Sequence, residues 1–267
     1  MVYEHQVEIM DQGRLAGVLH LPPPSMRPCP LVIYCPGKNG ERYEVHRLAV
    51  KFARALAKKG IAFLRFDYYG LGLSDGFYHQ MSTSTKVSNV KKAYEYATTL
   101  TSIDPNKIAY LGFSDGARIA LMSANQTNVN NILLWSPLFY EFGGNFPNGK
   151  HPRFKRHKKE TNVLVMPWAG LWVSMGFYQD LQTINVKKEL STYTGNSMII
   201  YGDDDPLIKE EFEYINTNEQ RLYSNSYKHQ VGVIKEAGHL FTSINFEYEL
   251  MKRSEEWLDD FLGVKGR

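Results

Sequence analysis

The sequence contains few of the features that would set it apart from ordinary globular proteins. Two cysteines, Cys29 and Cys35, occur in 267 residues, which is too few for a disulfide framework or a cysteine metal site. Cys35 ends an apolar, strand-like run that holds the two thiols apart, so we expect both to be reduced. We find no internal repeat and no low-complexity tract.

Long hydrophobic runs and strong charge are also missing. No apolar run is long enough to cross a bilayer, and residues 1–23 mix charges into the apolar positions that a signal peptide keeps clear. The net charge of +3 is too small to indicate nucleic-acid binding. The sequence therefore predicts a cytoplasmic protein without nucleic-acid or membrane partners, and it leaves a homodimer open.

What is present is the alternation of an α/β protein. With 267 residues, 43% of them hydrophobic and 22% charged, the chain is suited to one large domain or to one domain that carries an insertion. Residues 3–10 and 15–21 alternate as an antiparallel hairpin. Continuous apolar runs then indicate strands covered on both faces of a parallel sheet; these are LVIYC (31–35), IAFLRF (61–66), IAYLGF (108–113), NILLW (131–135), SMIIY (197–201) and QVGVI (230–234).

One long stretch interrupts this rhythm. Residues 138–195 are too many for an ordinary connection, and they contain a basic run, residues 150–159, followed by apolar pieces. Trp168, Leu171, Trp172 and Met175 have helical spacing. We predict a cap inserted at 138–195 between core segments 1–137 and 196–267.

Ser114 is the first candidate catalytic residue. It lies in Gly112-Phe113-Ser114-Asp115-Gly116, between a predicted strand and a predicted helix. At such a turn the serine takes a strained backbone conformation, and side chains at the two glycine positions would collide with neighbouring elements. The hydroxyl then lies at a helix N-terminus, where developing negative charge is favoured.

A nucleophilic serine needs a base and an acid, and later strands end in both. SMIIY is followed by Gly202 and three aspartates, Asp203, Asp204 and Asp205, and QVGVI is followed by Gly238-His239. This order of serine, aspartate and histidine after successive strands resembles the α/β-hydrolase superfamily. Against the G-D-x-D pattern common in that superfamily, the resemblance implies Asp205 as the acid, ahead of Asp203 and then Asp204.

The resemblance implies an α/β-hydrolase fold: an eight-stranded, mostly parallel sheet with an antiparallel N-terminal hairpin, helices on both faces and an inserted cap. It also implies an oxyanion hole built from two backbone N–H groups, those of Asp115 and Lys38. Lys38 lies in Cys35-Pro36-Gly37-Lys38-Asn39-Gly40, where proline replaces the superfamily's usual histidine. Residues 65–76 resemble a superfamily loop beside the active site, with no catalytic role assigned.

Substrate contacts rest on weaker patterns. The Asp115 carboxylate could hold a substrate ammonium or simply favour the helix N-terminus. Trp168, Trp172 and Met175 could line an acyl pocket or pack the cap on the core. The basic run could hold phosphates of a coenzyme A or carrier-protein thioester, hold negative groups of an acid, or form the solvent-exposed face of a cap hairpin. No cofactor or metal motif is found.

Together these patterns predict a serine hydrolase that cleaves a carboxylic ester through Ser114, His239 and Asp205. The position of the insertion resembles that of feruloyl and cinnamoyl esterases among the small-ester carboxylesterases. A thioesterase or acyltransferase would use the same three residues. A peptidase, or a non-catalytic binding module on the same scaffold, is a further alternative.

Overall fold

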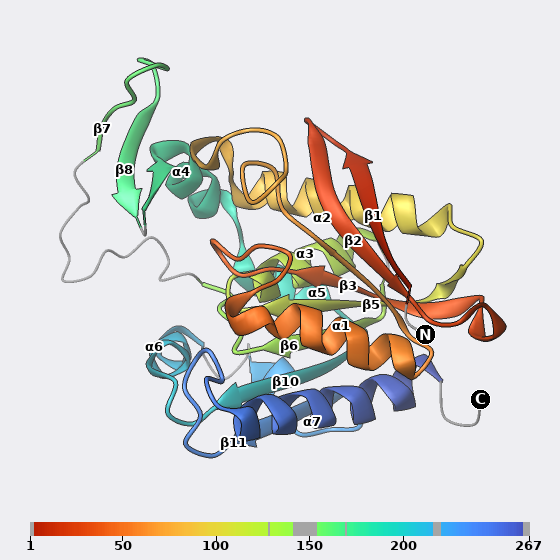
Figure 1. Ribbon diagram of the computed structural model, residues 1–267. Helices are drawn as coiled ribbons and strands as arrows, with labels where there is room; N and C mark the ends of the chain where they lie inside the picture. The colour runs from red at the N-terminus through yellow and green to blue at the C-terminus, as the bar shows by residue number, and fades with distance from the viewer. Residues whose placement is uncertain (1–2, 128, 141–153, 169, 216–219, 264–267) are drawn as a thin grey trace.

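The computed structural model describes residues 3–127, 129–140, 154–168, 170–215 and 220–263 (Figure 1). The side chains of Trp168, Tyr214 and Gln220 are outside this description. The strands are β1 (Tyr3–Met10), β2 (Arg14–Leu21), β3 (Cys29–Cys35), β4 (Ala62–Phe66), β5 (Ile103–Phe113), β6 (Asn131–Trp135), β7 (Lys155–Arg156), β8 (Leu164–Trp168), β9 (Leu171–Ser174), β10 (Asn196–Gly202) and β11 (His229–Ile234). The α-helices are α1 (Leu48–Lys58), α2 (Thr83–Thr98), α3 (Gly116–Thr127), α4 (Met175–Thr183), α5 (Val186–Thr192), α6 (Pro206–Tyr214) and α7 (Ile244–Leu262). Short 3-10 turns are η1 (Pro24–Met26), η2 (Val45–Arg47), η3 (Tyr78–Gln80) and η6 (Gln220–Tyr223).

The main sheet has eight strands in the order β1-β2-β4-β3-β5-β6-β10-β11. β1 pairs antiparallel with β2, and β2 pairs antiparallel with β4, whereas the remaining neighbours are parallel. This confirms the predicted hairpin followed by a parallel sheet. Each of the six apolar runs forms a strand of this sheet. β3 and β4 are buried along their whole length, as expected for strands covered on both faces.

Alternate residues of β3 show how the sheet separates two apolar layers. Leu31 and Ile33 pack with the buried faces of α2, α3 and α5, whereas Val32 and Tyr34 pack with α1 and α7. α2, α3 and α5 accordingly lie on one face of the sheet, and α1 and α7 lie on the other (Figure 1). With both faces covered, the ends of the parallel strands are the part of the sheet that is open to a substrate.

The region between β6 and β10 carries additional structure beside the main sheet. β7, β8 and β9 form a separate three-stranded antiparallel sheet, followed by α4 and α5, and β7 and β8 project outward in Figure 1. Part of the predicted insertion, residues 141–153, lies outside the described residues. The boundaries of the cap at 138 and 195 stay a prediction.

The interpretation of residues 168, 171, 172 and 175 as one face of a helix is wrong. Trp168 ends β8 and pairs with Leu171 of β9, while Trp172 pairs with Pro167. Gly170 has φ +81°, a left-handed conformation that favours a hairpin turn at glycine and ends any helix. The helix begins only at Met175, after the side chain of Ser174 caps it by accepting from the Phe177 N–H.

Two smaller expectations concern the cysteines and the membrane. Both thiols are buried and unlinked, at opposite ends of β3. Among the described helices, none combines the length and apolar character needed to cross a bilayer.

Candidate active site

The turn that holds Ser114 joins β5 to α3 and has the strained geometry that the glycine pattern predicts. Ser114 has φ +55°, a region that residues other than glycine rarely adopt. A Cβ on Gly116 would lie 2.1 Å from the Cys35 carbonyl oxygen, and one on Gly112 would lie 2.5 Å from the Gly116 carbonyl oxygen. Only glycine at these positions lets α3 start this close to β3 and β5.

Three side chains from distant parts of the chain meet at this turn. His239 Nε2 is 2.9 Å from Ser114 Oγ, and His239 Nδ1 is 2.7 Å from Asp205 Oδ2. In the neutral tautomer that fits both contacts, the serine hydroxyl donates to Nε2 and Nδ1–H donates to the carboxylate. The result is a continuous hydrogen-bonded chain of hydroxyl, imidazole and carboxylate.

The structure distinguishes the three consecutive aspartates. Asp205 is fully buried, and its second oxygen, Oδ1, caps α6 by accepting from the N–H groups of Leu207 and Ile208 at 2.9 and 3.3 Å. Asp203 and Asp204 are exposed, and Asp203 Oδ1 accepts from the Glu236 N–H at 2.6 Å, so Asp205 is the aspartate of the three that contacts the imidazole. Because each oxygen of Asp205 is engaged, the carboxylate holds the ring of His239 in one orientation.

The loop that follows β3 lies directly beside the serine. A Cβ on Gly37 would be 3.7 Å from Ser114 Cβ. Within the described residues, the backbone N–H of Asp115 donates no hydrogen bond to a protein acceptor. A cavity of about 210 Å³ opens here; its lining includes Lys38, Ser114 and His239 together with the apolar side chains Val45, Phe113, Leu138, Leu207 and Leu240.

The side chain of Asp115 does not point to a substrate site, which corrects the proposed ammonium contact. It is 1% exposed, and its two oxygens are ion-paired with Arg118 and, at 2.8 Å, with Lys86 Nζ. A substrate ammonium would have to displace one of these buried cations. Burial alone would raise the pKa of Asp115, but the charges of Arg118 and Lys86 outweigh it, and the pKa is lowered.

Lys86 connects both candidate oxyanion donors. Besides its ion pair with Asp115, Lys86 Nζ donates to the Lys38 carbonyl oxygen at 2.9 Å, which also accepts from the Tyr78 hydroxyl at 3.3 Å. Sequence reasoning missed Lys86 and Tyr78, because they lie in segments unrelated to the motif. A lysine on the otherwise buried face of α2 is the one signal that could have drawn attention to this position.

Glu44 is a second residue that sequence reasoning missed. It is buried beside the cavity, and its Oε2 accepts from the Tyr34 hydroxyl at 2.7 Å and from the Gly37 N–H at 3.2 Å. Burial raises its pKa, although these hydrogen bonds oppose the effect. Glu44 therefore fixes the start of the loop that carries Lys38.

The remaining predicted contacts lie elsewhere. Trp172 lines a different cleft, where Lys155 Nζ is 4.4 Å from its ring centre. Met175 is partly buried at the start of α4 and is not among the residues that line the cavity at Ser114. The Trp168 side chain and residues 150–153 of the basic run lie outside the described residues.

The segment at residues 65–76 forms a loop without a direct role at the serine. Ser74 Oγ donates to the Asp67 carbonyl oxygen at 2.7 Å and accepts from the Ala16 N–H at 2.9 Å. The Asp67 carboxylate accepts from the N–H groups of Arg42 and Leu73. These contacts shape the loop from inside, as the sequence pattern indicates.

The sheet order, the strained turn and the hydrogen-bonded side chains define the class: the protein has the α/β-hydrolase fold. A solved structure of Est1E from Butyrivibrio proteoclasticus with bound ferulic acid superposes with a TM-score of 0.78 and 21% identity, covering 96% of this chain and 99% of that one. A dienelactone hydrolase from Anabaena variabilis superposes with a TM-score of 0.65 and 16% identity, covering 97% and 98%. At such identities the likeness establishes the fold alone.

Comparison by sequence finds matches to about half of the chain. The family model described as Esterase FrsA-like matches residues 1–132. An uncharacterized protein of Mycobacterium tuberculosis is 34% identical over 131 residues, covering 49% of this chain and 44% of that protein. Esterase FrsA of Yersinia enterocolitica is 33% identical over 118 residues, covering 44% and 27%. These relatives are therefore matched over less than half of their own length. The segment that the family model matches contains Ser114 but neither Asp205 nor His239.

Proposed function

We propose that the protein is a serine hydrolase that cleaves carboxylic esters through an acyl-enzyme intermediate. One observation carries the proposal: the hydrogen-bonded chain from Ser114 through His239 to Asp205, on a strained turn at the start of a helix. The similarity of residues 1–132 to FrsA-like esterases supports the same reaction class.

In the first step, Ser114 Oγ attacks the ester carbonyl carbon while His239 Nε2 takes the hydroxyl proton. The tetrahedral intermediate then collapses, the carbon–oxygen bond to the alcohol breaks, and the imidazolium gives its proton to the departing alcohol. Asp205 keeps the imidazole in the required tautomer and stabilises its positive charge without taking the proton itself.

Backbone donors stabilise the negative oxygen of that intermediate. The Asp115 N–H lies at the start of α3, where the helix dipole favours negative charge, and the Lys38 N–H is the candidate second donor. Lys86 acts on the residues of both donors through the Asp115 carboxylate and the Lys38 carbonyl. It therefore serves as a positioning residue that does not touch the substrate.

In the second step, water attacks the acyl carbon of the acyl-enzyme. His239 removes a proton from the water and returns one to Ser114 Oγ, which releases the free acid. No cofactor enters this sequence, and each proton is passed through the imidazole.

The cavity at Ser114 indicates the size of the acid. Its volume of about 210 Å³ is below the range of about 300–1,000 Å³ that holds drug-sized ligands. Apolar side chains form much of its wall, so it is suited to a short or moderate apolar acyl group. The position of the insertion, which resembles that of feruloyl and cinnamoyl esterases, makes hydroxycinnamate methyl esters a useful second substrate set.

A panel of p-nitrophenyl acetate, butyrate and octanoate with hydroxycinnamate esters tests the proposal. We expect hydrolysis by the wild type and a loss of about 10³-fold or more in kcat/KM for Ser114→Ala and His239→Gln. A fluorophosphonate probe should label the wild type and not Ser114→Ala. Equal rates for the wild type and Ser114→Ala on every substrate would overturn the proposal. Acyl thioesters and added alcohol acceptors in the same panel separate thioesterase and acyltransferase activity from ester hydrolysis.

A further inference from the structure

A second cleft lies between the loop that follows β4 and the three-stranded sheet. Its walls are formed by residues 76–79 on one side and by residues 155–160 and 170–172 on the other, with a volume of about 690 Å³. We call it the basic cleft. It shares no lining residue with the cavity that contains Ser114, so it is a separate place on the surface.

The charged residues that line the basic cleft are mostly positive. Lys155, Arg156, Lys158 and Lys159 line it, and Glu160 is the one acidic residue among the described residues that do so. Lys158 and Lys159 are exposed and have no carboxylate partner within the described part of the chain. Cationic groups gathered around a concave surface focus a positive potential that attracts anions.

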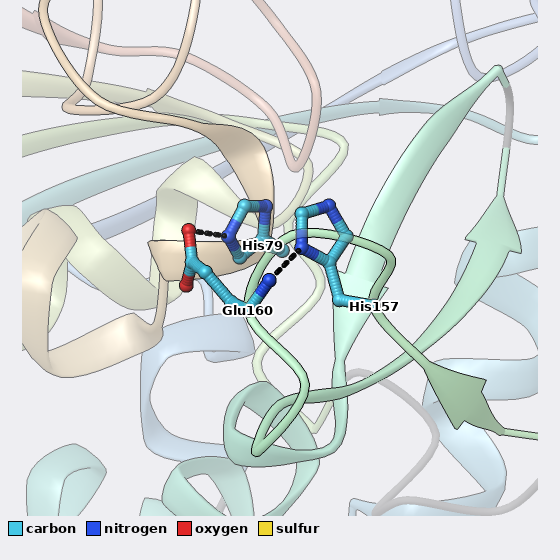
Figure 2. Close-up of side chains that lie close together, drawn as sticks. All are labelled: His79, His157 and Glu160. Atoms are coloured by element: carbon cyan, nitrogen blue, oxygen red, sulfur yellow. Dashed lines mark hydrogen bonds and ion pairs between the residues drawn. The ribbon is translucent and has the colours of Figure 1, made fainter.

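Glu160 is already engaged with the two histidines of the cleft. Its Oε1 accepts from His79 Nε2 at 3.0 Å, and its backbone N–H donates to His157 Nδ1 at 3.2 Å. Figure 2 shows the carboxylate turned toward His79 and the backbone nitrogen turned toward His157. The carboxylate is therefore directed to the wall of the cleft and not to the two lysines.

The same three residues could hold a divalent cation by type, since their donor atoms lie within 4.8 Å of one another. Two observations disfavour that use. The Glu160 carboxylate and His157 Nδ1 already take part in the hydrogen bonds just described. The four cationic side chains around the cleft would also repel a metal cation. The electrostatics of the cleft are those of an anion site.

Aromatic side chains line the cleft beside the charges. Phe77 and Trp172 are 63% and 37% exposed, and the Phe77 ring stacks on His79 with 5.7 Å between centroids and 11° between planes. Large aromatic side chains left open to water in a concave site are typical of surfaces that bind a flat ligand. A volume of about 690 Å³ accommodates a ligand of drug size.

We propose that the basic cleft binds a nucleotide-type ligand, with two or more phosphate charges at Lys158 and Lys159 and a flat ring against Phe77 and Trp172. Multiple phosphates match several cations better than one carboxylate does, and phosphate oxygens accept from lysine in many orientations. The ring supplies the apolar contact that a simple inorganic anion lacks.

Isothermal titration calorimetry of the wild-type protein with ADP, pyrophosphate and adenosine tests this proposal. We expect ADP to bind and pyrophosphate to bind more weakly than ADP. Adenosine should bind at least about tenfold more weakly than ADP. ADP affinity should fall as ionic strength rises, because screening weakens the exposed lysine contacts. Trp172→Ala should weaken the binding of ADP more than the binding of pyrophosphate.

A charge-matched pair of double variants locates the site. Lys158→Ala/Lys159→Ala should lower ADP affinity about tenfold or more, whereas Lys58→Ala/Lys91→Ala, which removes two exposed lysines of α1 and α2, should leave it unchanged. Absence of ADP binding at low salt, or equal affinity in both double variants, would overturn the proposal. So would tight Zn²⁺ binding that requires His79 and excludes ADP. Esterase activity is measured separately, so neither result depends on the other.

Discussion

Asp115 follows the candidate nucleophile in the sequence, and its backbone and its side chain have different roles. The backbone N–H is the proposed oxyanion donor, whereas the carboxylate is buried between Arg118 and Lys86. A buried charge that loses its partner is strongly destabilised, because it keeps the cost of desolvation without the attraction that offset it. The residue next to Ser114 is therefore constrained from both sides.

Removing Lys86 tests this constraint. Lys86→Met should lower the free energy of unfolding by about 3–5 kcal/mol, since it leaves Asp115 with one cation fewer in the interior. Lys51→Met is the matched control, because Lys51 pairs with Glu247 at the surface, and it should change the free energy of unfolding by less than about 1 kcal/mol. Urea denaturation of both variants measures the difference; similar values would show that the buried pair carries no special energy.

Asp205 gives a second prediction at the residue scale. Asp205→Asn should keep an N-cap for α6, because asparagine also accepts from backbone N–H groups, but it should lower kcat by about 10⁴-fold by favouring the wrong imidazole tautomer. Circular dichroism and ester hydrolysis together check this result. Asp204→Asn is the control, since Asp204 is exposed, and it should retain full activity. A large effect at Asp204 would show that the acid has been assigned to the wrong residue.

At the scale of elements, α3 and α4 both have a glycine near the N-terminus, with opposite surroundings. A Cβ on Gly116 would lie 2.1 Å from a backbone oxygen of β3, whereas a Cβ on Gly176 would come no closer than 3.4 Å to Ser174 Oγ. The first glycine sets how closely a helix approaches the sheet. The second has no such role and weakens its helix through backbone entropy.

The two alanine substitutions should therefore have opposite signs. Gly116→Ala should destabilise the protein by about 1–3 kcal/mol through overpacking and reduce labelling of Ser114, whose turn precedes α3. Gly176→Ala should stabilise it by about 0.5–1 kcal/mol. Thermal denaturation of the pair measures both; a neutral Gly116→Ala would show that α3 can retreat from β3 at little cost.

For the whole molecule, the buried His20 on β2 links stability to pH. Arg65 Nε donates to His20 Nε2 at 2.8 Å, and burial together with the Arg65 charge lowers the pKa of His20 to about 4. The unfolded chain, with an ordinary histidine pKa of about 6.5, binds the proton first as the pH falls. Stability from this group is complete above about pH 6.5 and is lost toward pH 4.

Between about pH 7.5 and pH 4.5, the wild type should lose about 2–3 kcal/mol more of its unfolding free energy than His20→Gln, which keeps an acceptor for Arg65 without titrating. Urea denaturation at both pH values measures this difference. Parallel profiles for the two proteins would show that His20 becomes protonated in the folded state without cost.

The sequence predicted those features of the molecule that are determined by short, continuous segments of the chain. Every apolar run became a strand, and Ser114, Asp205 and His239 follow strand ends that the parallel sheet brings to one edge. The catalytic roles of these residues stay a prediction. The environment of Asp115 and the contacts of Lys86 could not be predicted, because they depend on how α2 packs against a turn about thirty residues away.

The error in the three-stranded sheet has a similar origin. Aromatic and apolar residues at 168, 171, 172 and 175 fit one face of a helix, but they fit a hairpin equally well when a glycine turns the chain between them. The identity of the turn residue, Gly170, was the better signal. Spacing alone does not distinguish the two structures over so short a segment.

The two cysteines, sealed within the sheet, have a practical consequence for labelling. Thiol-directed dyes and spin labels react with accessible thiolates, and neither Cys29 nor Cys35 is accessible. A single Arg156→Cys substitution, at an exposed residue that lines the basic cleft outside the two proposed phosphate-binding lysines, would therefore provide one attachment point with little background from the native chain. A fluorophore placed there would report directly on what enters.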